Sequence, residues 1–114
     1  MMQEIKRIRK EMGISQKEVA EKLNVTLKTY NLWEKTDTKR KKNVLQVFIR
    51  YEYKDHLLGL GVSRLSKLLN INTGNLSVYL RSGREIKGLD SVLEKRKQEI
   101  LDLKYECMKM ITRL

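Results

Sequence analysis

Residues 15–35 of this 114-residue chain read SQKEVAEKLNVTLKTYNLWEK, and 46 residues later the pattern returns at residues 61–81 as GVSRLSKLLNINTGNLSVYLR. Both stretches have an asparagine near the middle, and they agree mainly at positions that need an apolar side chain. The matching pairs are Val19 with Leu65, Leu23 with Leu69, Asn24 with Asn70, Val25 with Ile71, Tyr30 with Leu76, Leu32 with Val78 and Trp33 with Tyr79. The repeat extends upstream, because residues 12–14 (MGI) correspond to residues 58–60 (LGL). The chain therefore contains one motif twice.

Apolar residues recur at helical spacing along the whole chain, and no segment alternates convincingly at the period of two that strands require. In the first copy of the motif, a helix is expected to begin at Ser15, which forms a capping box with Glu18. A turn follows at Asn24, because asparagine tolerates the positive φ expected between two closely joined helices. Thr26 then caps a helix over residues 27–35. The sequence predicts an all-α protein.

The repeat also predicts how the chain is divided. In the second copy, helices are expected over residues 62–69 and 73–81. A helix over residues 44–58 would close the first unit and, in the repeat register, would also open the second. One linking helix would then be shared by both cores. The expected parts are a first helix-turn-helix unit at residues 1–42, a second unit at residues 43–86 and a C-terminal helix at residues 87–114.

An apolar stripe follows the expected C-terminal helix at alternating spacings of four and three residues. The stripe comprises Leu89, Leu93, Arg96, Ile100, Leu103, Cys107, Met110 and Leu114, of which seven of eight are apolar. This is the pattern of a two-stranded coiled coil and favours a homodimer. The predicted dimer contacts are Leu93, Ile100, Leu103, Cys107 and Met110. Alternatively, the stripe packs on the helical units of its own chain, and Arg96 within it counts against a uniform coiled coil.

The chain is strongly basic, with 25 Lys and Arg against 14 Asp and Glu and a formal net charge of +11. A field of that sign attracts polyanions, so nucleic acid is the first partner to consider. The first third is the most positive and ends in a basic run at residues 39–42 (KRKK). Lys39 and Arg40 are candidate phosphate contacts, although such a run is equally typical of a solvated loop.

The residue inventory excludes several kinds of site. A single cysteine, Cys107, cannot form an internal disulfide, and one histidine, His56, leaves no zinc-ligand set. The sequence has no glycine-rich phosphate loop and no catalytic constellation, so we expect neither an enzyme nor a cofactor, metal or small-molecule ligand. No apolar run approaches the ~18 to 20 residues of a membrane helix, and the N-terminus lacks a signal-peptide core. A soluble cytoplasmic protein without membrane contact is expected.

Residues 5–35 resemble the Cro/repressor-type helix-turn-helix, also called the xenobiotic-response-element family. The resemblance is carried by Gly13, Ile14, Ser15, Gln16, Val19, Ala20, Leu23, Val25, Trp33 and Glu34, in the order and spacing of that family. Residues 58–83 resemble the same motif more loosely, because Ser66 replaces the usual alanine and the first helix does not begin with glutamine. The resemblance implies two tandem helix-turn-helix motifs that bind double-stranded DNA.

The resemblance also implies roles for residues of the first unit. Gln16 corresponds to the residue that binds a backbone phosphate, and Lys35 flanks the backbone. The groove-facing positions are Thr26, Leu27, Lys28, Asn31 and Leu32. Leucine can meet only a thymine methyl group, whereas lysine can approach guanine and asparagine can pair with adenine.

In the second unit the corresponding positions form a neutral, polar surface. They are Asn72, Thr73, Gly74, Ser77 and Val78, with Asn75 near the helix start and Arg81 flanking it. Gly74 weakens the helix that carries this surface, although it would also permit close approach of the backbone to a phosphate. The alternative is that the second unit has lost DNA contact and serves as scaffold or partner surface.

The expected function is sequence-specific binding of double-stranded DNA, as in a transcriptional regulator of the kind found in mobile elements. A dimer would present up to four recognition helices. One alternative is an accessory factor in recombination, conjugation or plasmid replication. Another is a protein-interaction adaptor, antirepressor or antitoxin-like, whose motif faces protein.

Overall fold

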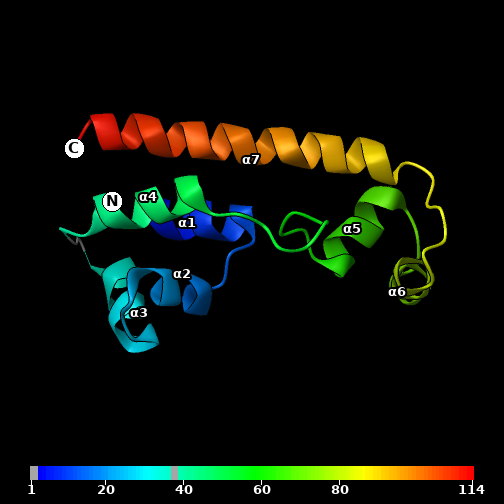
Figure 1. Ribbon diagram of the computed structural model, residues 1–114, viewed down its shortest axis with the longest axis horizontal. Coiled ribbons are helices and arrows are strands. Elements are labelled where there is room, and N and C mark those ends of the chain that lie inside the picture. Colours follow the sequence, from blue (N-terminus) through cyan, green and yellow to red (C-terminus); the bar gives the residue numbers. More distant parts are fainter. Residues whose placement is uncertain (1–2, 37–38) are drawn as a thin grey trace.

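The computed structural model describes residues 3–36 and 39–114, and the described residues form helices joined by turns and loops without any strand, which confirms the all-α prediction. The helices are α1 (Gln3–Met12), α2 (Gln16–Leu23), α3 (Leu27–Lys35), α4 (Lys41–Arg50), α5 (Val62–Leu69), α6 (Thr73–Ser82) and α7 (Leu89–Thr112). Figure 1 shows α7 running along one side, with α1 and α4 beneath it and α2 and α3 beyond them. The α5–α6 pair lies at the other end. None of the described helices is long and apolar enough to span a bilayer.

The first core is built by α1 to α4 together with part of α7. Ile5, Ile8 and Met12 on one face of α1 are fully buried, as their helical spacing predicts. They pack with Tyr30 of α3 and Phe48 of α4. Both helices of the motif have the predicted bounds within one residue, which follows from caps that stop each helix at a defined position.

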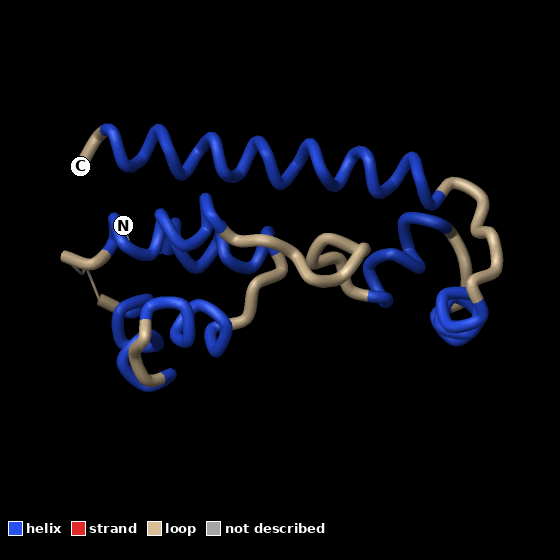
Figure 2. Tube along the Cα trace, viewed as in Figure 1, coloured by secondary structure: helices blue, strands red, loops and turns tan. Residues whose placement is uncertain are grey.

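The fourth helix is shorter than predicted. It begins at Lys41, inside the basic run, and ends at Arg50 rather than at residue 58. The chain then continues without a helix through residues 51–59, here called the strap (Figure 2). Tyr51 and Tyr53 pack edge to face with ring centroids 5.0 Å apart. The Asp55 carboxylate accepts a hydrogen bond from the Leu57 N–H over 2.8 Å, which favours a turn over a helix.

Side chains of α7 hold the strap in place. Arg96 donates to the Leu58 carbonyl over 3.0 Å, and Lys104 donates to the Tyr51 carbonyl over 3.0 Å. The Tyr51 carbonyl, which a longer α4 would have paired internally, is thereby satisfied from another helix. The prediction of a linking helix shared by both cores is therefore wrong.

The element that lines both cores is α7. Ile100, Leu103 and Cys107 belong to the first core, and Leu89 and Val92 near its start pack against the second. The second core is otherwise made by α5 and α6 with flanking loop residues, and its buried side chains are Leu60, Leu65, Leu76 and Ile86. A single straight helix thus supports both units along its length (Figure 1).

The two units meet at the pair of glycines that the repeat places in register. Gly13 and Gly59 both have positive φ, +75° and +77°. A Cβ on Gly13 would lie 2.1 Å from the Gly59 carbonyl oxygen, and one on Gly59 would lie 2.4 Å from that of Met12. The hydroxyl of Tyr53 donates to the same Met12 carbonyl over 2.6 Å. Backbone therefore touches backbone where the units join.

Candidate nucleic-acid interface

Local capping sets the geometry of the α2–α3 pair. The Ser15 hydroxyl accepts from the Glu18 N–H over 3.1 Å, and the Glu18 carboxylate accepts from the Ser15 N–H over 3.3 Å. Asn24 adopts the left-handed conformation at φ 57° and ψ 43°, as predicted. The Thr26 hydroxyl then accepts from the Thr29 N–H over 3.2 Å and starts α3.

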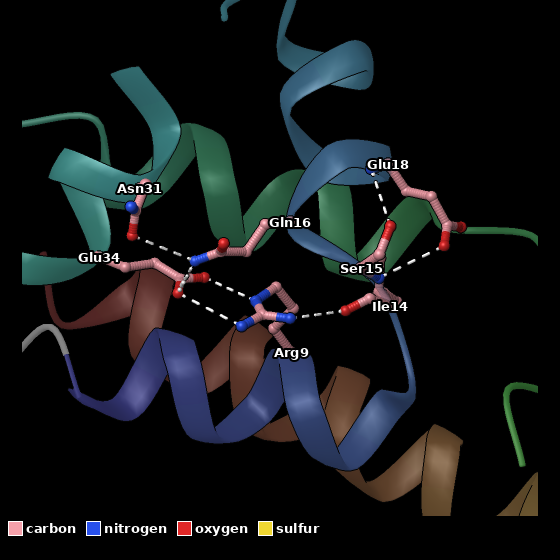
Figure 3. A network of polar contacts seen from close by, with 7 residues as sticks. All are labelled: Arg9, Ile14, Ser15, Gln16, Glu18, Asn31 and Glu34. Atoms are coloured by element: carbon pink, nitrogen blue, oxygen red, sulfur yellow. Dashed lines mark hydrogen bonds and ion pairs between the residues drawn. The ribbon is translucent and has the colours of Figure 1, made fainter. Parts of the chain in front are cut away.

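A buried ion pair fixes α3 against α1. Arg9 Nε donates to Glu34 over 2.6 Å, and both residues are less than a tenth exposed (Figure 3). Arg9 also donates to the Ile14 carbonyl over 2.9 Å in the loop before α2. Burial by itself raises the pKa of the Glu34 carboxyl, but hydrogen bonds, first of all from Arg9, lower it further than burial raises it. Glu34 is therefore ionised, and it holds three segments together.

Gln16 connects this ion pair to the exposed face of α3. Its amide nitrogen donates to Glu34 over 2.8 Å and to the Asn31 side-chain oxygen over 3.4 Å (Figure 3). The bond to Asn31 is at the long limit for a hydrogen bond and is the weaker of the two. An amide proton of Gln16 can turn to a phosphate by giving up that bond.

The exposed face of α3 mixes apolar and basic side chains. Leu27 is 48% exposed and Leu32 is 57% exposed, although both are leucines on a helix beside a packed core. Lys28 and Lys35 are exposed on the same helix, and Asn31 is half-buried against Gln16. Thr26 is exposed at the N-cap, where its hydroxyl also donates to that of Thr29. The residues predicted to face a groove thus lie on one helix surface.

The basic run lies at the start of α4. Lys39 and Arg40 are exposed immediately before it, and Lys42 is exposed in its first turn. Lys41 is paired with Glu4 of α1 over 3.5 Å. Positive charges at a helix N-terminus oppose the helix dipole, so this run destabilises α4 locally. The basic run therefore lies where the chain passes from α3 to α4, a helix of the first core, and not in a long free loop.

The α5–α6 pair repeats the backbone geometry of the α2–α3 pair. Asn70 lies at φ 56° and ψ 44°, within two degrees of Asn24. The serine that replaces the usual alanine, Ser66, donates to the Ser63 carbonyl over 2.7 Å and bonds the Thr73 hydroxyl over 3.1 Å. The close helix crossing therefore accommodates a hydroxyl with both of its bonds made.

The exposed face of α6 is neutral except at its end. Asn72 caps the helix by accepting from the Gly74 N–H over 2.8 Å. A Cβ on Gly74 would lie 3.1 Å from the capping oxygen, so the glycine leaves room for the cap. The remaining predicted contacts are the exposed Thr73, Asn75 and Arg81 and the half-buried Ser77, beside Val78, which is 52% exposed.

Most of the residues predicted for dimerisation lie in or against the first core and not on an exposed face. Ile100, Leu103 and Cys107 are buried in the first core, and Met110 packs against it, while Leu93 is half-buried. This placement corresponds to the alternative in which the stripe packs on its own chain. Burial raises the pKa of the Cys107 thiol to about 11, so this thiol is unreactive at neutral pH. Dimerisation through these residues stays a prediction, because a single chain does not test it.

The sequence interpretation missed the role of Arg9. Glu34 is part of the family-like pattern, but nothing in its spacing names a partner 25 residues earlier. The available signal was the position of Arg9 next to Ile8 on the inward side of α1, where an unpaired charge would be unfavourable. A buried arginine needs a buried acid as its partner, and α3 supplies Glu34.

One comparison with known proteins gives a match, and it lies in the first unit. Residues 5–43 match a family model described as Helix-turn-helix, of the Cro/C1 type. Among curated proteins and among solved structures, nothing gives a significant match to the chain. The matched family is a DNA-binding family rather than an enzymatic one. The match therefore supports DNA binding by the unit from α1 to the start of α4.

Proposed function

We propose that the protein is a sequence-specific regulator that binds double-stranded DNA with two reading helices, α3 and α6. The observation that carries the proposal is the capped α2–α3 pair, whose exposed helix is fixed from behind by the Arg9–Glu34 ion pair. A reading helix must keep its orientation against the phosphate backbone, and a buried two-point contact does this. The net charge of +11 supplies the attraction to DNA.

The second reading helix is proposed from the geometry of α5 and α6. Their turn has the same backbone conformation as the turn between α2 and α3. In Figure 1, α3 and α6 lie towards opposite ends of the molecule, both on the side away from α7. The long axis of 46 Å accommodates a separation of about 34 to 36 Å, one turn of DNA. One chain would then contact two successive major-groove segments.

The two helices would contribute differently to recognition. On α3, Lys28 is proposed to approach guanine, while Leu27 and Leu32 meet thymine methyl groups. Asn31 accepts from Gln16, so its amide nitrogen is directed away from that bond and towards a base. On α6, Asn75 and Ser77 would read bases without adding charge. Lys35, Lys39 and Arg40 would contact phosphates and release counterions.

The test begins with a duplex selected by the protein from a random library. Lys28→Ala is expected to weaken binding to that site by about 1 to 3 kcal/mol and to relax the base preference at one position. Asn75→Ala, on an exposed residue of the second helix, is expected to weaken binding by a similar mechanism at another position. Lys95→Ala removes the same charge as Lys28→Ala from the exposed surface of α7 and serves as the matched control.

The outcomes separate the competing roles. Loss from Lys28→Ala alone, with Asn75→Ala unchanged, would reduce the second unit to a scaffold. Equal losses from Lys28→Ala and Lys95→Ala would mean that charge, and not base contact, governs binding. Negligible affinity for every duplex at low salt would favour the protein-interaction adaptor. Binding at repeats remote from any promoter would favour the accessory factor.

A further inference from the structure

Two hydroxyl-bearing side chains replace an apolar pair where α5 meets the start of α6. In the repeat register, Ser66 and Thr73 occupy the positions of Ala20 and Leu27. Ser66 and Ala20 are both buried in the helix crossing, at 5% and 2% exposed. Thr73 and Leu27 are both exposed, and each is the first residue of its helix. The two positions therefore differ between the copies as a pair, although alanine suffices at the buried position of the first copy.

The hydrogen bonds at Ser66 give its contact with Thr73 a direction. A serine hydroxyl has a single hydrogen to donate. Ser66 donates it to the Ser63 carbonyl over 2.7 Å, a normal length for an O–H···O bond. The hydroxyl oxygens of Ser66 and Thr73 lie 3.1 Å apart, so the hydrogen between them comes from Thr73. Thr73 is therefore the donor and Ser66 the acceptor.

A threonine in this state faces outward as a hydrogen-bond acceptor. Its single hydrogen is directed inward at Ser66, and its oxygen keeps a lone pair for an outside partner. The described part of the chain supplies no second partner for this hydroxyl. To donate outward, Thr73 would have to give up the bond to Ser66, which costs about two- to tenfold in an equilibrium constant.

We propose that Ser66 is a positioning residue for base specificity that acts through Thr73, an inference that rests on the proposed binding of DNA by α6. A threonine with a free hydroxyl can pair with either kind of base edge. With its hydrogen held by Ser66, Thr73 accepts from the amino group of adenine or cytosine in the major groove. It disfavours guanine and thymine, which present carbonyl oxygens there.

The hydroxyl pair makes the two halves of the target unequal. At the matching position of the first unit, Leu27 has no hydroxyl and can contact only a thymine methyl group. The first half-site then favours a methyl group where the second half-site favours an amino group. A target of this kind has a direction, so the chain lies on it in one orientation even though its motif is repeated.

The test measures base preference, which a merely structural role of Ser66 would leave unchanged. Variants of the selected duplex carry each of the four bases at every position of the second half-site. Thr73→Val removes the hydroxyl but keeps the branched shape, so the position at which it loses preference is the one that Thr73 contacts. There the wild type should bind adenine and cytosine more tightly than guanine and thymine. Ser66→Ala, which frees the hydrogen of Thr73, should reduce this preference about two- to tenfold.

Two further variants control the measurement. Ser63→Ala is the same substitution at an exposed residue of α5 and leaves the Ser63 carbonyl in place, so it should keep the preference. Thr73→Ser retains a hydroxyl at the contact and should also keep the preference, whereas adding Ser66→Ala to it should reduce the preference. Circular dichroism melts establish that each variant is folded before binding is compared.

The outcomes separate this inference from the proposed function. An undiminished preference in Ser66→Ala, or a wild-type preference for guanine or thymine at the contact, overturns the role of Ser66 and leaves DNA binding by α6 in place. If Thr73→Val changes no preference although Asn75→Ala weakens binding, the base contact of Thr73 is overturned and α6 still binds DNA. Unchanged binding by both of these variants overturns the second reading helix, and the role of Ser66 with it.

Discussion

Single buried groups decide how firmly α3 is held. The carboxylate of Glu34 accepts from Arg9 and from Gln16, so one side chain joins α1, α2 and α3. Sequence patterns identified the apolar positions and the caps because each depends on residues a few positions apart. The partner of Glu34 lies 25 residues away and depends on how two helices pack, which no local pattern contains.

Glu34 gives the first prediction, a pH dependence of stability. Its folded pKa is lowered below the ordinary value of 4.5, so its contribution is complete at neutral pH and is lost as the pH falls through the folded pKa. Glu34→Gln is expected to reduce the free energy of unfolding by about 3 to 5 kcal/mol at pH 7, because it leaves the Arg9 charge buried without its partner. Urea unfolding should show the gap between wild type and variant narrowing as the pH falls below 4.5, the ordinary pKa of the carboxyl. A gap independent of pH would mean that the carboxylate charge does not stabilise the fold.

Gly59 gives the second prediction, about the junction between the units. Gly59→Ala places a Cβ 2.4 Å from the Met12 carbonyl oxygen at a φ of +77°, so the free energy of unfolding should fall by at least about 2 kcal/mol. Gly61→Ala is the control, because nothing lies within 4 Å of its Cβ. That change should remain within about 1 kcal/mol. Equal effects of the two substitutions in thermal or urea unfolding would contradict the backbone contact.

At the scale of elements, the strap is where sequence and structure differ, whereas the predicted long C-terminal helix is confirmed as α7. The bounds of α3 and α5 follow from the sequence because their caps and turns are local. The strap was interpreted as helix because Leu57 and Leu58 continue a helical spacing from Phe48. Its actual signals are the alternation of Tyr51 and Tyr53 and the turn at Asp55, and they prevail because α7 satisfies the strap carbonyls.

The third prediction concerns α7 as a structural element. A chain ending at Gly88 loses Ile100, Leu103 and Cys107 from the first core and the packing of Leu89 and Val92 from the second. It should lose cooperative thermal unfolding, since each buried apolar side chain contributes about 1.5 to 3 kcal/mol. A chain lacking only Arg113 and Leu114, both exposed, should unfold like the wild type in circular dichroism melts. A stable, cooperative chain ending at Gly88 would show that each unit completes its core without α7.

For the whole molecule, the relation between the two proposed reading helices is the property to test. The fourth prediction uses the selected duplex with base pairs inserted between its two halves. Five inserted base pairs rotate one half by about half a turn, so α6 can no longer reach its groove when α3 is seated. Affinity should fall at least as far as Asn75→Ala lowers it on the original site, and Asn75→Ala should cause no further loss on the lengthened site. Competition binding of the two duplexes measures both effects. Equal affinity for the two duplexes would mean that α3 and α6 do not bind DNA at a fixed separation.

The contact between Gly13 and Gly59 fixes the distance between the two units. Flexibly tethered DNA-binding units tolerate half-sites at several distances, because the linker absorbs the difference. Here the main chain of one unit lies directly on that of the other, and the Tyr53 side chain lies beside the contact with its hydroxyl bonded to the Met12 carbonyl. If both units bind DNA as proposed, a change in the distance between half-sites would require the backbone itself to be rebuilt, so that distance should change far more slowly in evolution than the bases that each helix prefers.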